Sequence, residues 1–536
     1  FDINTVMAYN ISTQKGDCGA LLSVLNPSYP NKKICGIHVA GSPSKNLGYS
    51  SLFSQEEILE CFSQIPDNNL IISQMDDCDL SPTEKLVGDG RFGNIKDADK
   101  EPSLASKTKI IPSLLSGKIS EPYMKPAKLK RKYTEEGLQD PWANAMLNYN
   151  MSTPVFDVES INYATEDYMD YLFGNSHVQV EPKVLTFEES ILGLPNTEFD
   201  SINRKTSPGY PDVVNNPPGF KGKTFYFGNG DEFDLETDTS KALKNKVLET
   251  IDLAKKNVRS EHIFMDCLKD ELRPVEKADT YKTRLISASS LELLILYRMY
   301  FGSYMLWYKL NRIDNQSAIG MNVFSDEWDY LAKKLKTFSP GKEKNVGAGD
   351  YSKFDGSEKP IVHNKILEVI EEWYDGTEED RNVRRVLWLE LTNSKHIQGK
   401  CIYEWYTSLP SGHPLTPIVN TMYNGIAFRY CWIRNFKNDR VLSRSFNNHV
   451  YLIALGDDNV FSVRGKYRNL FTEVTVGKYM KELGLTYTSE VKDAVNVNMR
   501  HLEDVEFLKR KWKFSKEANR YVAPLQEKRL LEILNW

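Results

Sequence analysis

The stretch YLIALGDDNVFSV (Tyr451–Val463) contains two apolar runs that flank a short polar turn. YLIAL is typical of a short buried strand, and VFSV of a second strand that returns after Gly456-Asp457-Asp458-Asn459. Hard divalent cations such as Mg²⁺ take oxygen ligands, often from a few carboxylates and from substrate phosphates. The stretch therefore predicts a hairpin whose tip could hold a metal ion. Because Gly, Asp and Asn are ordinary turn residues, an acidic, solvated tip explains this stretch alone equally well.

A second pair of carboxylates lies earlier in the chain, in VGAGDYSKFDGS (Val346–Ser357). Asp350 follows a small apolar run that could form a strand, and Asp355 follows in the next turn. If Asp350 ends such a strand, it can face the hairpin tip, with Asp355 within reach of the same cavity. Two strands would then deliver the carboxylates for two metal ions, which stabilise the attacking and leaving oxygens of an in-line displacement.

A Gly/Pro loop followed by a helix is predicted for LPSGHPLTPIVNTMYN (Leu409–Asn424). Thr416 can serve as the N-cap, with Pro417 at the first helical position. Ser411, Thr416 and Asn420 offer neutral hydrogen-bonding groups that suit the hydroxyls of a sugar. A capped helix without a binding role is the alternative interpretation.

Cations are concentrated in KDELRPVEKADTYKTRLISASS (Lys269–Ser290), which ends in a β-like RLISAS run. Phosphate groups need donors and positive charge arranged in a groove, so this order favours a phosphate channel over a solvated face. Further along, DVEFLKRKWKF (Asp504–Phe514) predicts an alternating strand that could hold a phosphate backbone. The cations of the two segments are Lys269, Arg273, Lys277, Lys282 and Arg284, and Lys509 and Arg510.

Composition indicates a globular protein with at least two folding units, because the 536 residues exceed one ordinary core. A net charge of −5 with 26% charged residues excludes a basic nucleic-acid tail and a disordered acidic one. The 7 cysteines are scattered and form no CxxC pair, which favours a reducing compartment. No apolar run reaches the ~18 residues of a membrane helix, and no signal peptide is visible. The chain starts with Phe1 in mid-pattern, as expected for a piece of a longer polypeptide.

Near the N-terminus, Gly16-Asp17-Cys18-Gly19 places a cysteine in a tight turn, where backbone N–H groups can point at an oxyanion. A buried cysteine in a β-protein is the alternative. With Thr13 and Gly36-Ile37-His38, the turn resembles the C-terminal barrel of the chymotrypsin-like cysteine proteases of picornaviruses and their insect-virus relatives. The resemblance implies that Cys18 is the nucleophile and that Thr13 and His38 form the pocket that reads a Gln side chain.

This resemblance has two departures. Ala20 stands where the family usually has Gly, and the family's general-base His and its acidic partner lie upstream of the position of Phe1. Since a thiol nucleophile normally needs a base nearby, we expect this part to be inactive as given. We assign residues 1–72 to the barrel remnant and residues 73–105 to a polar linker or processing junction, with Gln64 and Gln74 as alternative cleavage positions.

From about Ser106 onward, the motifs occur in an order that resembles the fingers and palm of RNA-dependent RNA polymerases of picornavirus-like viruses. They are SKTK-x2-PS, SPGYP, KDELR, RLI-x-ASS, Asp-x4-Asp, PSG-x3-T, GDD and FLKR. Several motifs in family order are far less accidental than single ones. GDCGA and the long insertions point to a dicistrovirus- or iflavirus-like relative. The implied fold is α+β, with right-hand fingers and palm over residues 106–536 and a helical thumb that should follow Trp536.

The resemblance also implies residue roles. Asp350 and Asp457 would ligate Mg²⁺, or Mn²⁺ in its place, with Asp458 assisting. Asp355 and Asn420, supported by Ser411 and Thr416, would recognise the ribose 2′-OH. The remaining roles are triphosphate contact by Lys269, Arg273 and Arg284 with Lys277 in the same channel, general acid catalysis by Lys492, and primer binding by Lys509 and Arg510.

The implied partners are an RNA template and primer, NTPs, a protein primer and other viral replication proteins. The implied location is the host cytoplasm, at replication complexes on membranes. Three other classes compete with this interpretation: a cysteine protease fragment, which lacks its base; a reverse transcriptase, against which the Asn420 and Asp355 pair argues; and a non-catalytic RNA-binding protein, which would need no carboxylate triad.

Overall fold

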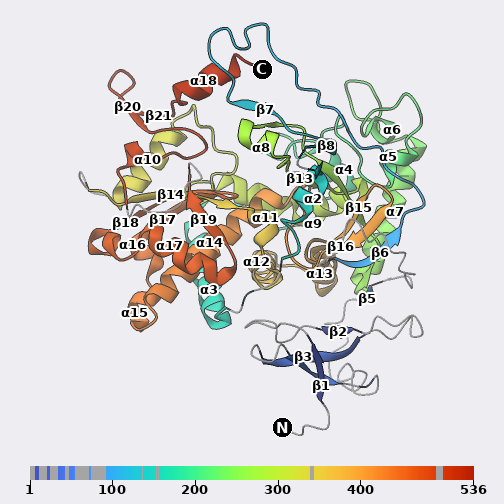
Figure 1. Ribbon diagram of the computed structural model, residues 1–536, viewed down its shortest axis with the longest axis horizontal. Coiled ribbons are helices and arrows are strands. Elements are labelled where there is room, and N and C mark those ends of the chain that lie inside the picture. Colours follow the sequence, from blue (N-terminus) through green and yellow to red (C-terminus); the bar gives the residue numbers. More distant parts are fainter. Residues whose placement is uncertain are drawn as a thin grey trace.

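The structure is a computed structural model, and it describes the following residues: 6–10, 21–23, 34–42, 47–52, 54, 72–73, 92–135, 137–151, 154, 156–338, 343–490 and 499–536. A small N-terminal sheet lies to one side of a larger mixed body of helices and sheets (Figure 1). No helix among these residues is long and apolar enough to cross a membrane.

The N-terminal sheet has four antiparallel strands in the order β1-β4-β3-β2. Their bounds are β1 (Val6–Asn10), β2 (Leu21–Ser23), β3 (Ile34–Ser42) and β4 (Leu47–Leu52). His38 of β3 is buried, and its Nδ1 is in hydrogen-bonding contact with the Tyr9 hydroxyl of β1. The β-structure predicted for this part is therefore present in the residues described.

A five-stranded sheet forms one half of the larger body, in the order β13-β11-β15-β16-β6. Its strands are β6 (Gly93–Asp97), β11 (Ile263–Leu268), β13 (Leu285–Ala288), β15 (Lys395–Gln398) and β16 (Cys401–Glu404). Strand β6 pairs with β16 at the edge, although its sequence lies in the segment predicted to be a linker. The folded larger body therefore extends upstream of Ser106, at least to Phe92, which is buried.

A chain of buried hydrogen bonds ties the strands of this sheet together. Asp266 of β11 contacts His396 of β15 (Oδ1 to Nδ1, 2.9 Å) and accepts from the hydroxyls of Ser287 and Tyr403. The Ser394 hydroxyl lies 2.7 Å from the other ring nitrogen of His396. This Ser-His-Asp row has the order of a hydrolytic triad, but all three side chains are 0% exposed, so it stabilises the sheet.

The sheet expected to form the palm, called the palm sheet below, has four antiparallel strands in the order β17-β18-β14-β19. They are β14 (Val346–Ser352), β17 (Val450–Leu455), β18 (Asp458–Val463) and β19 (Thr486–Ser489). The remaining strand pairs are β5 (Ile72–Ser73) with β10 (Val258–Arg259), β7 (Met124–Pro126) with β12 (Leu272–Pro274), β8 (Lys132–Thr134) with β9 (Gly137–Gln139), and β20 (Lys513–Ser515) with β21 (Arg520–Val522).

Helices surround both sheets (Figure 1). The longer ones are α3 (Val158–Asn175), α7 (Asp238–Lys255), α9 (Leu291–Leu310), α10 (Glu327–Thr337), α12 (Pro360–Trp373), α13 (Glu378–Thr392), α14 (Thr416–Asn435) and α17 (Glu473–Met480). The shorter ones are α2 (Pro141–Met146), α4 (Phe187–Leu192), α5 (Asp212–Asn215), α6 (Thr224–Phe227), α8 (Val275–Asp279), α11 (Phe354–Ser357), α15 (Arg440–Ser443), α16 (Phe446–His449) and α18 (Glu527–Ile533). Short 3₁₀ helices span Gly465–Asn469, Lys481–Leu483 and Leu502–Asp504.

The helix predicted after the Gly/Pro loop is α14. The Lys-rich segment Thr239–Lys256 and the apolar run Leu291–Leu310 also have the pattern of helices in the sequence, and they form α7, within one residue at each end, and α9. Helix α9 begins at the Ser290 cap, whose hydroxyl accepts from the Leu293 N–H at 3.2 Å. Most of its side chains are buried in the largest core cluster, which explains why the run is apolar nearly all round.

The apolar runs of the hairpin are continuous because both faces of the palm sheet are covered. Val450 and Leu452 of β17 belong to the core beneath α14 and α17, whereas Tyr451 and Ile453 belong to a second core against α10 and the C-terminal segment. Successive strand side chains point to opposite faces, so an apolar residue is needed at every position. This double burial fixes the register that places the hairpin tip beside β14.

Candidate active site

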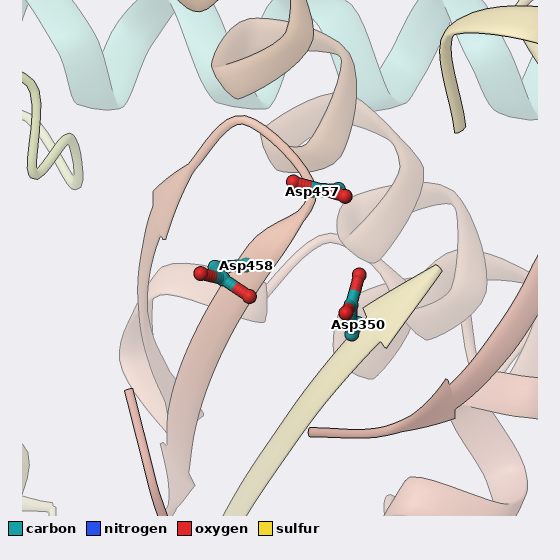
Figure 2. Close-up of side chains that lie close together, drawn as sticks. All are labelled: Asp350, Asp457 and Asp458. Carbon is teal, nitrogen blue, oxygen red and sulfur yellow. The ribbon is translucent and has the colours of Figure 1, made fainter. Parts of the chain in front are cut away.

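The structure brings the three predicted metal-ligating aspartates together. Asp350 lies on β14, Asp457 in the turn after β17, and Asp458 at the start of β18 (Figure 2). One carboxylate oxygen from each residue lies within 4.8 Å of those of the other two. The pairing of β14 with β18, which sets Gly349 opposite Asn459, makes this approach possible. The predicted convergence of the cluster is confirmed.

Glycines make the approach possible at two positions. Leu455 pairs with Asp458, so Gly456 and Asp457 form a two-residue turn, and Gly456 has a positive φ of 63° that favours glycine. The turn is shorter than the four residues expected, because Asp458 already belongs to β18. On β14, a Cβ added at Gly349 would lie 2.1 Å from the Tyr487 ring, so only glycine fits beneath this ring.

The three carboxylates repel one another. Burial, and then the charges of Asp350, Asp458 and Asp355 in that order, raise the pKa of Asp457 to about 7. A divalent cation would relieve this repulsion, and carboxylate oxygens are the ligands that Mg²⁺ and Mn²⁺ prefer. The residues present therefore fit a divalent metal centre.

Helix α14 fixes the hairpin tip through residues that the sequence reasoning missed. The Thr421 hydroxyl accepts from the Gly456 N–H at 2.9 Å, and Asn424 Nδ2 donates to the Gly456 carbonyl at 3.0 Å. Asn424 Oδ1 accepts in turn from the hydroxyl of Tyr351, the residue after Asp350, at 2.9 Å. Both α14 side chains are buried. Helix α14 thus holds the two strands that carry the cluster in one arrangement.

The predicted sugar-reading pair is also formed. Asn420 Nδ2 donates to Asp355 Oδ1 at 2.6 Å. Burial raises the pKa of Asp355, while the Asn420 hydrogen bond and then the charges of Arg284 and Lys269 act in the opposite direction. Asn420 is buried, and its Oδ1 has no hydrogen-bond partner among the residues that the structure describes. An unpartnered buried acceptor costs free energy, so this oxygen is suited to accept from a ligand hydroxyl.

The predicted helix cap is wrong by one residue. Helix α14 starts at Thr416 with Leu415 at the cap position, and no side chain caps it. The Thr416 hydroxyl instead donates to the Pro410 carbonyl at 3.3 Å, which closes the loop before the helix. Ser411 is half-buried in that loop, so both residues lie beside the start of α14, within the segment expected to support Asn420.

The cations of the basic motif Lys269–Arg284 lie around the carboxylate of Glu271. Arg284 Nε donates to Glu271 at 2.6 Å, and Lys269 and Arg273 each lie 3.8 Å from a Glu271 oxygen. Burial alone would raise the pKa of Glu271, yet the Arg284 hydrogen bond and the three positive charges lower it. Arg284 also interacts electrostatically with Asp457 and Asp355, so it faces the carboxylate cluster. Lys277 is half-buried on α8, and Lys282 is exposed.

The predicted strand over Asp504–Phe514 is wrong. Leu508 and Lys509 have positive φ angles of 52° and 62°, so the chain makes a tight turn closed by Phe507 and Arg510. Lys509 is exposed at the tip. Arg510 donates to the Ala523 carbonyl at 2.7 Å and covers the Phe324 ring at 4.6 Å. Arg510 is therefore engaged by the protein itself, and Lys509 is the more accessible cation of the pair.

Several predicted residues lie outside the described part of the chain. They are Thr13, Cys18 and Lys492, together with the cleavage positions Gln64 and Gln74.

Comparisons with known proteins agree with this geometry. A family model described as "Viral RNA-dependent RNA polymerase" matches residues 121–536, and one described as "3C cysteine protease (picornain 3C)" matches residues 1–43. Since the first match covers more than half of the chain, the chain belongs to the viral RNA-dependent RNA polymerase family. The predicted order of a protease part followed by a polymerase part is confirmed.

Curated relatives sharpen this assignment. The chain is 34% identical to the replicase polyproteins of Drosophila C virus and of acute bee paralysis virus, over 98% and 99% of its length. These matches confirm the predicted dicistrovirus-like relationship. The chain spans about a third of the length of these relatives, 31% and 29% respectively.

A solved structure agrees with the fold. The Sicinivirus 3Dpol RNA dependent RNA polymerase has a TM-score of 0.66, covering 82% of this chain and 85% of its own at 20% identity. The predicted α+β polymerase fold is therefore confirmed.

Proposed function

We propose that this chain catalyses template-directed RNA synthesis, in which the 3′-OH of an RNA primer attacks the α-phosphate of an NTP and pyrophosphate leaves. The observation that carries the proposal is the convergence of Asp350, Asp457 and Asp458 at one point of the palm sheet. Two Mg²⁺ ions, or Mn²⁺ in their place, would supply electrostatic stabilisation of the attacking and leaving oxygens when bound. The three carboxylates would hold them.

The side chains around the cluster have separate tasks in this proposal. Arg284 and Lys269 lie on the side of Asp355 and Asp457, where their charge would bind the triphosphate. Arg273 and Lys277 would line the same channel. Lys492 would donate a proton to the pyrophosphate, and Lys509 and Arg510 would hold the primer strand.

Ribose selection would reside in the Asn420–Asp355 pair, with Ser411 and Thr416 in support. A site built to hydrogen-bond a substrate hydroxyl rejects the analogue that lacks it, because buried polar groups are then left unpaired. The unpartnered Asn420 Oδ1 supports this assignment. The same feature favours ribonucleotides, and hence an RNA polymerase over a reverse transcriptase.

The wider setting of the chain is part of the proposal. The chain would act within a viral nonstructural polyprotein that also carries a cysteine endopeptidase, of which Cys18 is the nucleophile and Thr13 and His38 the specificity residues. Its partners would be template and primer RNA, NTPs, a protein primer and other viral replication proteins. Replication complexes on membranes in the host cytoplasm are the proposed location.

Primer extension on an RNA template tests the proposal. We expect the chain to extend an RNA primer with NTPs in Mg²⁺ and to use dNTPs far less well. Asp252→Asn, a change of an exposed aspartate on α7, is the matched control for changes in the cluster and should leave extension unchanged. Extension with dNTPs as efficient as with NTPs would favour a reverse transcriptase, and no extension by a folded, RNA-binding chain would favour a non-catalytic RNA-binding protein.

A further inference from the structure

An exposed, positively charged segment lies outside the site residues described above. The residues from Met124 to Thr134 include no acid, and five of them are cations. All five are exposed: Lys125, Lys128, Lys130, Arg131 and Lys132. The last of them begins β8, the first strand of the β8–β9 hairpin.

Buried residues hold this segment in place. Ala127 and Leu129 are 4% and 6% exposed, and they alternate with the exposed Lys128 and Lys130. Leu129 belongs to a core cluster with Phe92 and Trp405. The alternation keeps apolar side chains inside and cations outside, so the cations form a fixed surface.

The charge of this surface is largely uncompensated within the described residues. Lys125 pairs with Asp279 at 2.9 Å. The ion pairs found among the described residues include none with Lys128, Lys130, Arg131 or Lys132. Glu135, in the turn after β8, is exposed and forms none with them either. Four cations held together without acidic partners favour a polyanionic ligand.

An exposed aromatic side chain follows the cations in the sequence. Tyr133 is 79% exposed on β8, opposite Leu138 of β9, which is 45% exposed. The ring contacts found among the described residues do not include Tyr133. Single-stranded RNA is bound by this combination, because bases stack on aromatic rings while cations follow the phosphates.

The surface is continuous with the basic motif beside the active site. Strand β7 pairs with β12, which sets Lys125 opposite Arg273. Further along, the Thr283 hydroxyl, next to Arg284, donates to the Lys128 carbonyl at 2.7 Å. A phosphate backbone that follows these cations would therefore run between the β8–β9 hairpin and the carboxylate cluster. This continuity favours RNA over an anionic membrane surface.

We propose that Lys128, Lys130, Arg131, Lys132 and Tyr133 form a binding surface for the single-stranded part of the RNA. The four cations bind consecutive phosphates, and Tyr133 stacks on one base. This inference depends on the function proposed above, because its ligand is the RNA on which the polymerase would act.

Equilibrium binding of a fluorescent single-stranded RNA to the full chain, without nucleotides, tests the surface at several salt concentrations. We expect Tyr133→Ala to weaken binding roughly tenfold, and Tyr133→Phe to leave it unchanged, because stacking needs the ring and not the hydroxyl. Lys130→Ala with Arg131→Ala should make the plot of log affinity against log salt less steep by about 0.7 for each phosphate that the chain no longer neutralises. Lys437→Ala, an exposed lysine beyond α14, is the matched control and should change neither.

The proposal would be overturned if the Tyr133→Ala variant and the Lys130→Ala, Arg131→Ala variant both had the affinity and the salt slope of the unaltered chain. Loss of binding to anionic phospholipid vesicles, with RNA binding retained, would also overturn it and would assign the surface to a membrane. Because nucleotides are absent, the result does not depend on catalysis. A chain that binds RNA through the β8–β9 surface but extends no primer would refute the proposed function and leave the proposed RNA-binding surface intact.

Discussion

The carboxylate cluster and the basic motif are both groups of like charges, but they balance their repulsion differently. Lys269, Arg273 and Arg284 surround Glu271, so the motif carries its own counter-charge. In the cluster, burial and then the charges of Asp350, Asp458 and Asp355 raise the pKa of Asp457. The basic motif is therefore partly neutralised by Glu271 of the chain itself, whereas the unbalanced charge of the cluster supports its proposed role as a divalent metal site.

Removing one charge from the cluster should have the largest effect. We expect Asp457→Asn to lower kcat at least ~10³-fold, because a metal ligand that stabilises charge in the transition state is lost. Melting temperatures measured without metal should rise in this variant, since the repulsion is relieved. A variant that retains activity, or that melts lower than the unaltered chain in metal-free buffer, would contradict this account.

The stabilisation in that variant should depend on pH. The folded pKa of Asp457, about 7, lies above its usual value of 3.8, so the folded state binds more protons between these values. The unaltered chain should therefore lose stability as pH rises from about 4 to about 7, and Asp457→Asn should lose less. Metal-free melting curves across this range measure the difference, and parallel pH profiles of the two proteins would show that the repulsion is absent.

Asn420→Ala should act on selectivity more than on folding. Loss of the 2.6 Å hydrogen bond to Asp355 should lower kcat/KM for NTPs more than for dNTPs, at least tenfold out of a discrimination that can reach ~10⁴. Kinetics with both nucleotides, alongside a melting temperature, separate the two effects. An unchanged ratio in a normally folded variant would remove Asn420 from the site.

Thr421→Val tests how helix α14 holds the hairpin tip. The buried Gly456 N–H would lose its acceptor, which costs about 1–3 kcal/mol of stability. We expect kcat to fall while the NTP/dNTP ratio stays constant, because Asn420 is untouched. Thr421→Ser keeps the hydroxyl and should restore kcat. Full kcat in the valine variant would mean that the methyl group, and not the hydrogen bond, positions the turn.

Glu271→Gln should have the smallest effect. Removing the counter-charge should lower KM for NTPs by roughly threefold, since the cations then bind the triphosphate more strongly. The kcat should fall modestly, because Arg284 loses its oriented hydrogen bonds to the carboxylate. Steady-state kinetics decide the direction, and a higher KM would mean that Glu271 orients the cations more than it weakens their charge.

The carboxylates were predictable because their motifs carry both parts of the argument. GDD and Asp-x4-Asp give the ligands, and the apolar runs around them give the strands that bring the ligands together. The Asn420–Asp355 pair followed from the resemblance to known polymerases. Thr421 and Asn424 were missed because threonine and asparagine on a helix have no distinctive pattern, and their partner is a backbone group that only the folded hairpin presents.

Other errors have local causes. The turn at Leu508-Lys509 needs two positive φ angles, and neither residue type favours them, so no turn signal is visible in this stretch. The α14 cap was misplaced because Thr416 bonds to the preceding loop instead of the helix. Strand β6, GNIKD, is short and polar, and it forms only because the edge of β16 is available. Each depends on a tertiary partner that no local pattern records.

Single-nucleotide incorporation opposite a defined template base tests the central claim most directly. The unaltered chain should add the complementary NTP to an RNA primer in Mg²⁺, and Asp350→Ala should add none, while Asp252→Asn should behave like the unaltered chain. Incorporation by a folded Asp350→Ala variant at the rate of the unaltered chain would contradict the assignment of the carboxylate cluster as the catalytic centre.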